Sequence, residues 1–311
     1  MNNNIIKLTV NKNDANQTIF NFIKKMFKTT SLSVLYKLFR NKKIKVNNKV
    51  VKDRSYHLQE NDVILIFDKA LVVTNRGSSQ PCQPQSGILP IVYEDDNILI
   101  VDKPHGVEMH SNLHESLDGM VRNYLITTNQ YQLDQEQSFV ISHLHRLDKF
   151  TRGLVIYVKN KITLDLLLAK INNKNVVHKT YLAKCEDDYQ VDNLVVEGYL
   201  TKNEDLKKMV FTPHLVNNTS KDCATQFKTL KIINNTTWLR VTLLTGRKHQ
   251  IRATLSYLHH PVVNDVKYGA KKITPDYMIY LYAYQLAFAN LTGHLAYLNE
   301  KVFKIQENII K

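Results

Sequence analysis

A polar stretch rich in proline, glycine and serine divides the chain into two parts. It runs from Arg76 to Gly87 and contains Pro81 and Pro84. Proline has no backbone N–H and a fixed φ, so such a stretch favours neither a helix nor a central strand. We therefore expect two folded blocks joined by a linker, and 311 residues are enough to give each block a core.

The chain carries a large positive charge. Lysine and arginine number 42 against 28 aspartates and glutamates, which gives a net charge of +14. Such a surplus favours a polyanionic partner, either nucleic acid or an anionic membrane. The chain is also rich in Asn, Lys and Ile, a composition that an AT-rich genome produces by itself. The distribution of the charge is therefore more informative than its total.

The block before the linker concentrates this charge. Between Asn16 and Arg54, eleven basic residues stand against one acidic residue, Asp53. A solvated charged face is one interpretation, but the uneven distribution favours a phosphate-binding surface. Membrane-surface binding is a weaker alternative, because the block lacks the apolar face of an interfacial helix. The residues we expect to contact phosphates here are Lys37, Arg40, Lys42 and Lys43.

Local patterns in this block predict two short helices and a hairpin. Apolar residues recur at helical spacing over 19–26 and again over 35–39. Alternating segments at 44–46 and 49–51 flank the pair Asn47 and Asn48, which is typical of a two-residue hairpin turn. A further strand is predicted at 63–67.

The cysteines and the apolar runs indicate a cytoplasmic protein. Cys82, Cys185 and Cys223 form no CxxC pair, which fits a reducing compartment and argues against a zinc site or a disulfide framework. The segment from Met1 to Val10 lacks the apolar stretch of a signal peptide. No apolar run approaches the length of a membrane span, so we expect no membrane association.

The block after the linker mixes strand and helix patterns. Buried strands are predicted at 98–101, 154–158 and 239–244, and an amphipathic helix is predicted around 164–171. There is no regular alternation of strand and helix and no internal repeat. We therefore expect an α+β fold rather than a doubly wound sheet.

Three segments of this block carry polar residues suited to chemistry. In H-R-L-D-K-F-T-R-G-L at 145–154, Asp148 lies between Arg146 and Lys149, and nearby positive charge favours an ionised carboxylate. Such a group can act as a nucleophile or a base, although an ion pair that orders a turn is the commoner role. In T-G-R-K-H-Q-I-R-A-T-L at 245–255, a clamp for phosphate or carboxylate competes with a plain basic turn. Alone, Tyr181 in K-T-Y-L-A at 179–183 indicates only packing.

Taken together and in this order, the three segments resemble the motifs of the RluA-type pseudouridine synthases. Those motifs are H-R-L-D-x-x-T-x-G-L, K-x-Y-x-A and G-R-x-H-Q-I-R. Two further segments are similar to the family, V-Y-E-D-D-N-I-L-I-V-D-K-P-H-G at 92–106 and H-P-V-V-N-D-V-K-Y-G at 260–269. The first block resembles an S4 RNA-binding domain over 14–69, which leaves a linker at 70–88 and a catalytic domain at 89–305.

The resemblance implies a fold and an activity. The expected fold is α+β, with a mixed, largely antiparallel sheet and flanking helices, preceded by a small S4-like domain of helices and a β-hairpin. The expected reaction isomerises uridine in RNA to pseudouridine. No atoms are gained or lost, so we expect no cofactor and no metal. His105, His110 and His114 could be read as metal ligands, but they lack a frame of cysteine or carboxylate ligands.

The resemblance also assigns roles to residues. Asp148 is then the catalytic carboxylate, Arg252 is its ion-pair partner, and Tyr181 lies over the uracil ring as a general base. Arg146 is placed to fill the gap that the departing base leaves, and Arg247 and Lys248 bind RNA. Departures from the family pattern are Asp102 in place of Asn, Arg152 in place of Ser or Thr, and Leu-Tyr-Ala at 281–283 in place of Leu-His-Ala.

The expected partner is RNA, acted on by a monomeric enzyme. The segment L-Y-K-L-F-R-N-K-K-I-K-V-N at 35–47 resembles the S4 segment of the RluC-like branch, which implies large-subunit ribosomal RNA as substrate. The alternative is a catalytically inactive RNA-binding or ribosome-assembly factor with the same fold. Such a factor has no need for Asp148, Tyr181 and Arg252 together.

Overall fold

The computed structural model describes residues 5–68, 71, 73, 88–111, 115–132, 138–171, 176–275, 278–306 and 309–310. For 170 and 171 it describes the backbone only. Most of the expected linker at 70–88, together with Cys82 and His114, lies outside the described residues. Within the described part, no helix is long and apolar enough to cross a membrane.

The N-terminal domain consists of two helices and a four-stranded antiparallel sheet of order β1-β4-β2-β3. Its elements are β1 (Ile5–Thr9), α1 (Ile19–Met26), α2 (Leu32–Arg40), β2 (Ile44–Val46), β3 (Lys49–Val50) and β4 (Val63–Phe67). The predicted helices, hairpin and last strand are confirmed. Strand β1 precedes the S4-like segment expected at 14–69 and pairs with β4.

Local chemistry explains why these elements form. The apolar residues of α1 and α2 that recur at helical spacing are buried together, and the Thr18 side chain caps α1 by accepting a hydrogen bond from the Asn21 N–H. Asn47 and Asn48 both have positive φ, +47° and +65°, as the tight turn between β2 and β3 requires.

The larger domain contains one long sheet. Its described strands run in the order β11-β10-β12-β13-β9-β14-β8-β6-β5, with β15 added at β14 and β7 at β8. Only the β14–β8 pairing is parallel among those described, so the expectation of a mixed, largely antiparallel sheet with flanking helices is confirmed. The strands are β5 (Ile91–Glu94), β6 (Ile98–Lys103), β7 (Ser142–His143), β8 (Arg152–Val158), β9 (Val177–Glu186), β10 (Leu194–Asn203), β11 (Lys208–Thr212), β12 (Lys221–Ile233), β13 (Thr236–Leu243), β14 (Leu281–Phe288) and β15 (Val302–Lys304). The helices are α3 (Leu117–Thr127), α4 (Lys161–Ile171), α5 (Gln250–Tyr257) and the short 3-10 turns η3 (Val266–Tyr268) and η4 (Gly293–Leu298).

Both faces of the central strands are covered. Leu99 and Val101 of β6 pack in the cluster that includes residues of α3. Ile98 and Ile100 point to the other face, where residues of α4 and η4 join them. This double burial explains why residues 98–101 of β6 and 154–158 of β8 are continuous apolar runs instead of alternating ones.

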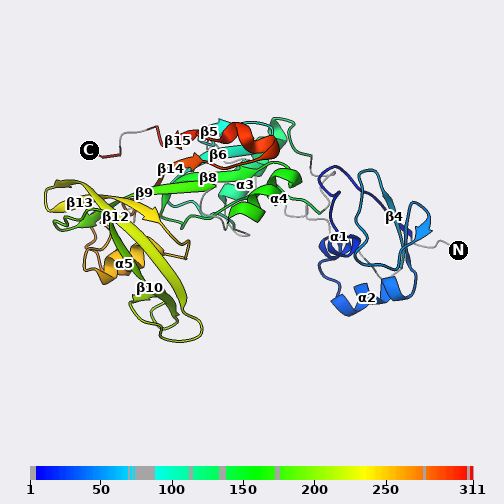
Figure 1. Cartoon of the computed structure of the whole chain (residues 1–311), viewed down its shortest axis with the longest axis horizontal. Coiled ribbons are helices and arrows are strands. Elements are labelled where there is room, and N and C mark those ends of the chain that lie inside the picture. Colours follow the sequence, from blue (N-terminus) through cyan, green and yellow to red (C-terminus); the bar gives the residue numbers. More distant parts are fainter. Residues whose placement is uncertain are drawn as a thin grey trace.

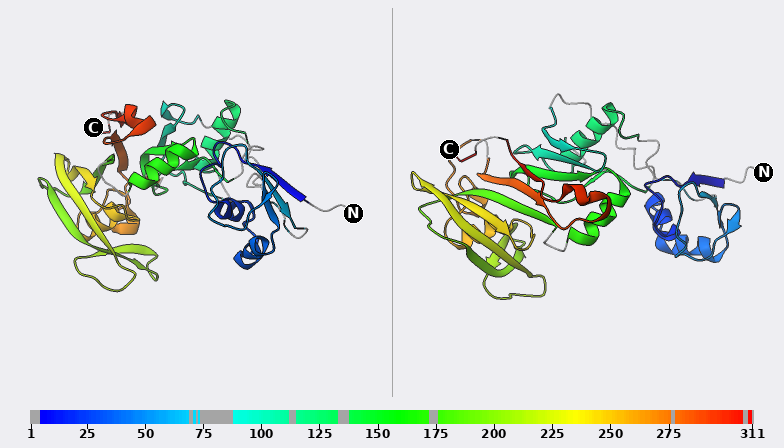
Figure 2. Two further views of the ribbon diagram at one scale, coloured as in Figure 1. Left: turned by 45° about the vertical axis from the view of Figure 1, so that its right-hand side comes forward. Right: turned by 45° about the horizontal axis from the view of Figure 1, so that its top comes forward.

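The chain is elongated, with the N-terminal domain at one end and strands β10–β12 at the other (Figure 1, Figure 2). We call β10, β11 and β12, with the turns between them, the arm. Helix α5 packs against the arm, where Leu200, Phe211, Cys223, Ala253 and Tyr268 form a separate small core.

A buried carboxylate joins the two domains. The Asp14 side chain, fully buried, accepts hydrogen bonds from the Ser138 N–H (2.8 Å), the Phe139 N–H (3.2 Å) and the Ser138 hydroxyl. The Gln17 amide donates to the same hydroxyl at 2.6 Å. Asp14 and Gln17, which lie between β1 and α1, therefore dock on a segment of the larger domain more than a hundred residues later in the chain.

Candidate active site

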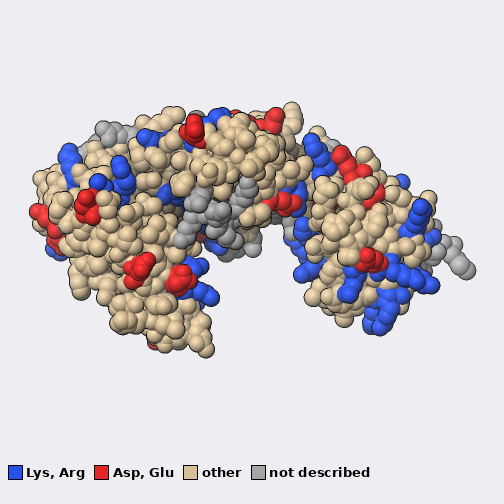
Figure 3. Space-filling view, viewed as in Figure 1, with Lys and Arg blue, Asp and Glu red and all other residues tan. Residues whose placement is uncertain are grey.

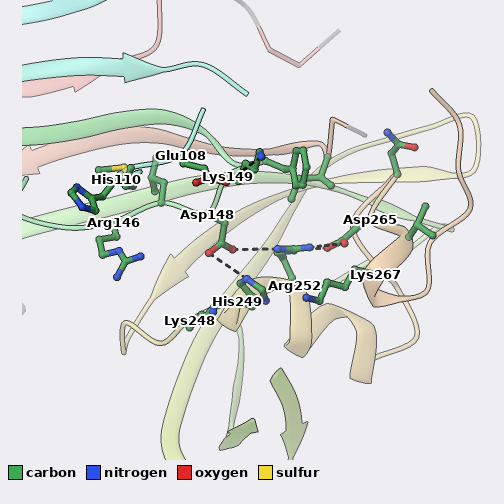
Figure 4. A pocket seen from close by; sticks show the side chains of 16 residues that line it. Glu108, His110, Arg146, Asp148, Lys149, Lys248, His249, Arg252, Asp265 and Lys267 are labelled. Carbon is green, nitrogen blue, oxygen red and sulfur yellow. Dashed lines mark hydrogen bonds and ion pairs between the residues drawn. The ribbon is translucent and has the colours of Figure 1, made fainter. Parts of the chain in front are cut away.

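A cavity of about 430 Å³ opens between the loop that precedes β8 and the start of α5. This volume is within the usual range for pockets that hold a small ligand. Charged side chains surround it, and Asp148 points from one wall toward Arg252 and His249 on the other (Figure 4). The polar residues that line it are Glu108, His110, Arg146, Asp148, Lys149, Lys248, His249, Arg252, Asn264, Asp265 and Lys267.

The loop that carries Asp148 is fixed by Lys103. This lysine is fully buried, and its ammonium group donates to the carbonyl oxygens of Pro104, Val107 and Lys149 at 2.8, 2.9 and 3.0 Å. Burial lowers the pKa of Lys103 to about 8, although Asp148 and Asp102 act in the opposite direction. Lys103 lies in the segment 92–106 that is similar to the family, and the sequence alone indicated no role for it.

A glycine is required where this loop enters β8. Gly153 has a φ of +135°, and a Cβ atom there would lie 2.4 Å from the Ala283 carbonyl oxygen. Strands β8 and β14 start their parallel pairing at this point. A larger residue would push the two strands apart directly beside the Asp148 loop.

Arg252 lies between two carboxylates. It is 5% exposed, and its Nη1 lies 3.4 Å from Asp148 Oδ2, as expected for an ion-pair partner. Its shorter contacts are with Asp265, Nε to Oδ2 at 2.6 Å and Nη2 to Oδ1 at 2.8 Å. Burial disfavours the charged guanidinium, but the hydrogen bonds and charge of Asp265 outweigh it and raise the pKa of Arg252. Asp265 lies in the segment 260–269 that is similar to the family, but the sequence alone did not indicate its contact with Arg252.

Tyr181 is buried beside the cavity. It is 7% exposed and packs in the same cluster as Leu147 and Ile279, two residues that line the cavity. Tyr181 itself is not a lining residue. Burial, and then the charge of Asp148, raises the pKa of its hydroxyl well above the ordinary value, so the hydroxyl is neutral.

His249 contacts Asp148 from the side opposite Arg252. Its Nε2 is 3.5 Å from Asp148 Oδ1, and its Nδ1 is 2.7 Å from the Tyr268 hydroxyl. Burial lowers the pKa of His249 to about 4, against the opposing effect of the Asp148 charge. His249 lies in the segment 245–255, and the sequence alone indicated no role for it.

The residues expected to bind RNA fall into different places. Arg146 and Lys248 are exposed and line the cavity. Arg247 turns away from it and pairs with Asp222 at the start of β12, with Nη2 2.8 Å from Oδ1. Lys37, Arg40 and Lys42 are exposed on and after α2 of the N-terminal domain, and Lys43 forms an ion pair with Asp68 at 2.8 Å.

His114, one of the three histidines considered as metal ligands, lies outside the described residues, and the other two contact different groups. His105 Nδ1 lies 2.8 Å from the Phe150 carbonyl oxygen, and His110 lies 3.4 Å from Asp118. No group of three or more histidine, cysteine, aspartate or glutamate side chains arranged to hold a metal ion occurs in the described ranges.

Two of the departures from the family pattern contact each other. Arg152 donates to Asp102 through Nη2 at 2.8 Å and Nε at 3.2 Å, and the two side chains are 23% and 11% exposed. The third departure, Tyr282, packs edge-on against His105 with ring centroids 5.5 Å apart.

Known proteins resemble this chain in both of its domains. A family model described as RNA pseudouridylate synthase matches residues 97–257, and a model of the S4 domain matches 17–64. A protein of Mycoplasma capricolum subsp. capricolum, described as an uncharacterized RNA pseudouridine synthase, is 46% identical over 95% of this chain and 96% of its own length. The ribosomal large subunit pseudouridine synthase C of Vibrio cholerae is 30% identical over 85% of this chain and 81% of its own.

Solved structures show the same fold. Human RNA pseudouridylate synthase domain containing 4 aligns with a TM-score of 0.55 and 20% identity, over 70% of this chain and 88% of that one. Human RNA pseudouridylate synthase domain containing 1 aligns with a TM-score of 0.52 and 23% identity, over 66% and 81%. The family model covers more than half of the chain and the Mycoplasma relative covers nearly all of it. The chain therefore belongs to the RNA pseudouridine synthases, isomerases that convert uridine in RNA to pseudouridine, and it carries an S4 domain ahead of the catalytic domain.

Proposed function

We propose that this enzyme modifies large-subunit ribosomal RNA and that Asp148 is its catalytic carboxylate. The observation that carries the catalytic proposal is the position of Asp148, which lies on the wall of the cavity between Arg252 and His249. The similarity to the ribosomal large subunit pseudouridine synthase C of Vibrio cholerae supports the ribosomal substrate. We also propose that the enzyme acts as a monomer in the cytoplasm, where the ribosomal RNA of bacteria is found.

The reaction needs one carboxylate. The N1–C1′ bond of uridine breaks, the uracil turns, and C5 bonds to C1′; C5 loses its proton and N1 gains one, so the atoms balance. Asp148 can capture or stabilise positive charge at C1′, as carboxylates do when other glycosidic bonds break. Attack on the uracil ring and removal of a ribose proton are the other two routes open to it. Each route needs the carboxylate held in one orientation, and the ion pair with Arg252 supplies such a contact.

Arg252 stabilises the site because Asp265 holds it. A guanidinium with two nitrogens bound to a buried carboxylate cannot rotate freely, so its third nitrogen is presented to Asp148 in a fixed direction. The pair also keeps a positive charge beside Asp148 in a place that water does not reach easily.

Tyr181 is the residue we assign to the uracil ring. Its buried position in one cluster with Leu147 and Ile279 supports a packing role beside the cavity. Because the raised pKa keeps its hydroxyl protonated, Tyr181 acts as a general base only by passing on its own proton while it accepts another. A Tyr181 side chain that is deprotonated before the reaction is disfavoured.

The RNA must present a flipped nucleotide, which costs a few kcal/mol. Arg146 is exposed at the cavity and is suited to fill the space that the base vacates. Contacts between the protein and phosphates of the RNA backbone supply binding energy that offsets the free-energy cost of flipping the nucleotide. Figure 3 shows an arch in which the arm and the S4 domain flank a hollow, with lysine and arginine gathered over the S4 domain, some of them on its side facing the hollow.

Tritium release tests the catalytic proposal. We expect Asp148→Asn to abolish release from RNA that contains 5-tritiated uridine, with RNA binding unchanged, because Asn keeps the shape of Asp and removes its charge. Normal release by this variant would refute the role of Asp148. No release by the wild type on any ribosomal RNA would favour the alternative, a binding or assembly factor. Chemical mapping of pseudouridine in ribosomal RNA from cells with and without the gene tests the substrate.

A further inference from the structure

The backbone at His249 is not explained by helix stability. His249 immediately precedes α5 and has a φ of +53°, in the left-handed region that disfavours residues with a Cβ atom. Residues in this position usually adopt an extended conformation and cap the helix with a short polar side chain. The His249 side chain makes no such cap. The strained position therefore points to a role for the imidazole itself.

The hydrogen-bond partners of the imidazole define its tautomer. The Tyr268 hydroxyl accepts the Met209 N–H at 3.1 Å and lies 2.7 Å from His249 Nδ1. If the Tyr268 hydroxyl donates its proton to Nδ1, it both accepts and donates a hydrogen bond, Nδ1 is the acceptor, and the imidazole proton resides on Nε2. The opposite tautomer would leave the Tyr268 proton without an acceptor among the described residues. The first arrangement places the proton on Nε2, the ring nitrogen that lies 3.5 Å from Asp148 Oδ1.

The charges around the imidazole agree with a neutral ring. Arg252, Lys248 and Lys267 disfavour a further positive charge at His249, and Asp148 favours one. Burial is the largest influence, and it lowers the pKa to about 4, so the ring is uncharged near pH 7. A neutral imidazole adds a directed donor to the site without adding charge.

We propose that His249 is a positioning residue for Asp148. Its Nε2–H orients the carboxylate at Oδ1, while Arg252 orients it at Oδ2. The Tyr268 hydroxyl fixes the imidazole tautomer that carries the proton on Nε2. The inference rests on the proposed role of Asp148. It also ties the arm to the chemistry, because the Met209 N–H that fixes Tyr268 belongs to β11.

The central test is His249→Asn in the full-length protein. Asparagine tolerates a positive φ, and its amide reaches the position of Nδ1 but not that of Nε2. We expect unchanged RNA affinity and an unchanged melting temperature, with a single-turnover rate at saturating RNA lowered by about 10-fold to 100-fold. His249→Gly relieves the backbone strain and is expected to melt no lower than wild type and to react as slowly as His249→Asn.

The matched control is His259→Asn. His259 lies just after the same helix, has a φ of +64° and is exposed, so the same substitution is made in the same backbone conformation away from Asp148. We expect its rate, affinity and melting temperature to equal those of the wild type.

Tyr268→Phe tests the tautomer. It keeps the ring, which covers the Arg252 guanidinium at 4.8 Å, and removes the hydroxyl. We expect a loss of rate in the wild-type background and no further loss in the His249→Asn background. Independent, multiplicative losses would overturn the role of Tyr268, and a wild-type rate for both His249→Asn and His249→Gly would overturn the proposal. If His249→Asn is fully active while Asp148→Asn is inactive, only this inference fails. If Asp148→Asn is active, both the proposed role of Asp148 and the inference about His249 fail.

Discussion

The arrangement of Arg252 between Asp265 and Asp148 allows a quantitative prediction. In Arg252→Met, Asp265, whose side chain is 1% exposed, is left without both of its short charged hydrogen bonds, and Asp148 is left without the cation 3.4 Å away. Removing one partner of a buried ion pair leaves an uncompensated charge and destabilises by roughly 3–5 kcal/mol. In a domain of this size each kcal/mol lowers the melting temperature by roughly 2–4 °C, so we expect a fall of about 6–20 °C.

Thermal unfolding followed by circular dichroism measures this loss, and tritium release measures the activity, which we expect to be severely reduced. The matched control is Arg247→Met. Arg247 also pairs with an aspartate at 2.8 Å, but its side chain is 35% exposed and that of Asp222 is 71% exposed. Exposed pairs contribute less than about 1 kcal/mol, so this variant should melt within a few degrees of the wild type.

A second substitution separates charge from packing. Asp265→Asn, added to Arg252→Met, removes the uncompensated carboxylate and keeps its shape. We expect the double variant to regain part of the lost stability and none of the activity, because Asp148 still lacks its cation. The reasoning would be refuted if Arg252→Met melted like the wild type, or if the double variant were no more stable than the single one.

Three further outcomes are expected. Tyr181→Phe should lower the single-turnover rate and leave RNA binding unchanged, because it keeps the ring and removes the buried hydroxyl; an unchanged rate would exclude proton transfer by Tyr181. A truncated chain that begins at Ser86 should bind ribosomal RNA more weakly than the full-length protein and still react at saturating RNA. The slope of log affinity against log salt concentration should be shallower by roughly 0.7–0.9 for each phosphate that the S4 domain neutralises in the full-length protein. Filter binding at several salt concentrations and single-turnover rates check both parts, and an unchanged slope would mean that the basic residues of the S4 domain contact only solvent. Burial lowers the pKa of Lys103 to about 8 in the folded protein from 10.5 in the unfolded chain, so the unfolded state binds more protons between these pH values. The contribution of Lys103 to the free energy of unfolding should therefore grow as the pH rises from about 8 to 10.5. Denaturant unfolding of the wild type and of Lys103→Met across that range measures this contribution, and parallel pH profiles for the two proteins would contradict it.

Much of the fold could be predicted where the determining contacts are close in sequence. The two helices of the S4 domain follow from apolar spacing, and the hairpin follows from Asn47 and Asn48. Strands β6 and β8 follow from unbroken apolar runs. Strand β1 could not be predicted in this way, because its pairing with β4 joins segments more than fifty residues apart and β1 by itself has no distinctive pattern. The boundaries at 14–69, 70–88 and 89–305 stay predictions.

The residues of the site also differ in how far the sequence alone could predict them. The motif resemblance pointed to Asp148 and Arg252, which the structure brings within 3.4 Å of each other. It did not reveal that Asp265 binds Arg252, since that contact depends on how the turn η3 folds back on α5. Nor did it reveal that Arg247 turns toward Asp222, because a run of basic residues does not indicate which side chain faces the cavity. The docking of Asp14 on Ser138 left no signal in either segment alone.

The contact between Asp102 and Arg152 has a consequence for how this lineage diverged. Reversion of either residue alone to the residue common in the family leaves the other as a charge of low exposure without its counterion. The two positions are therefore expected to covary among relatives.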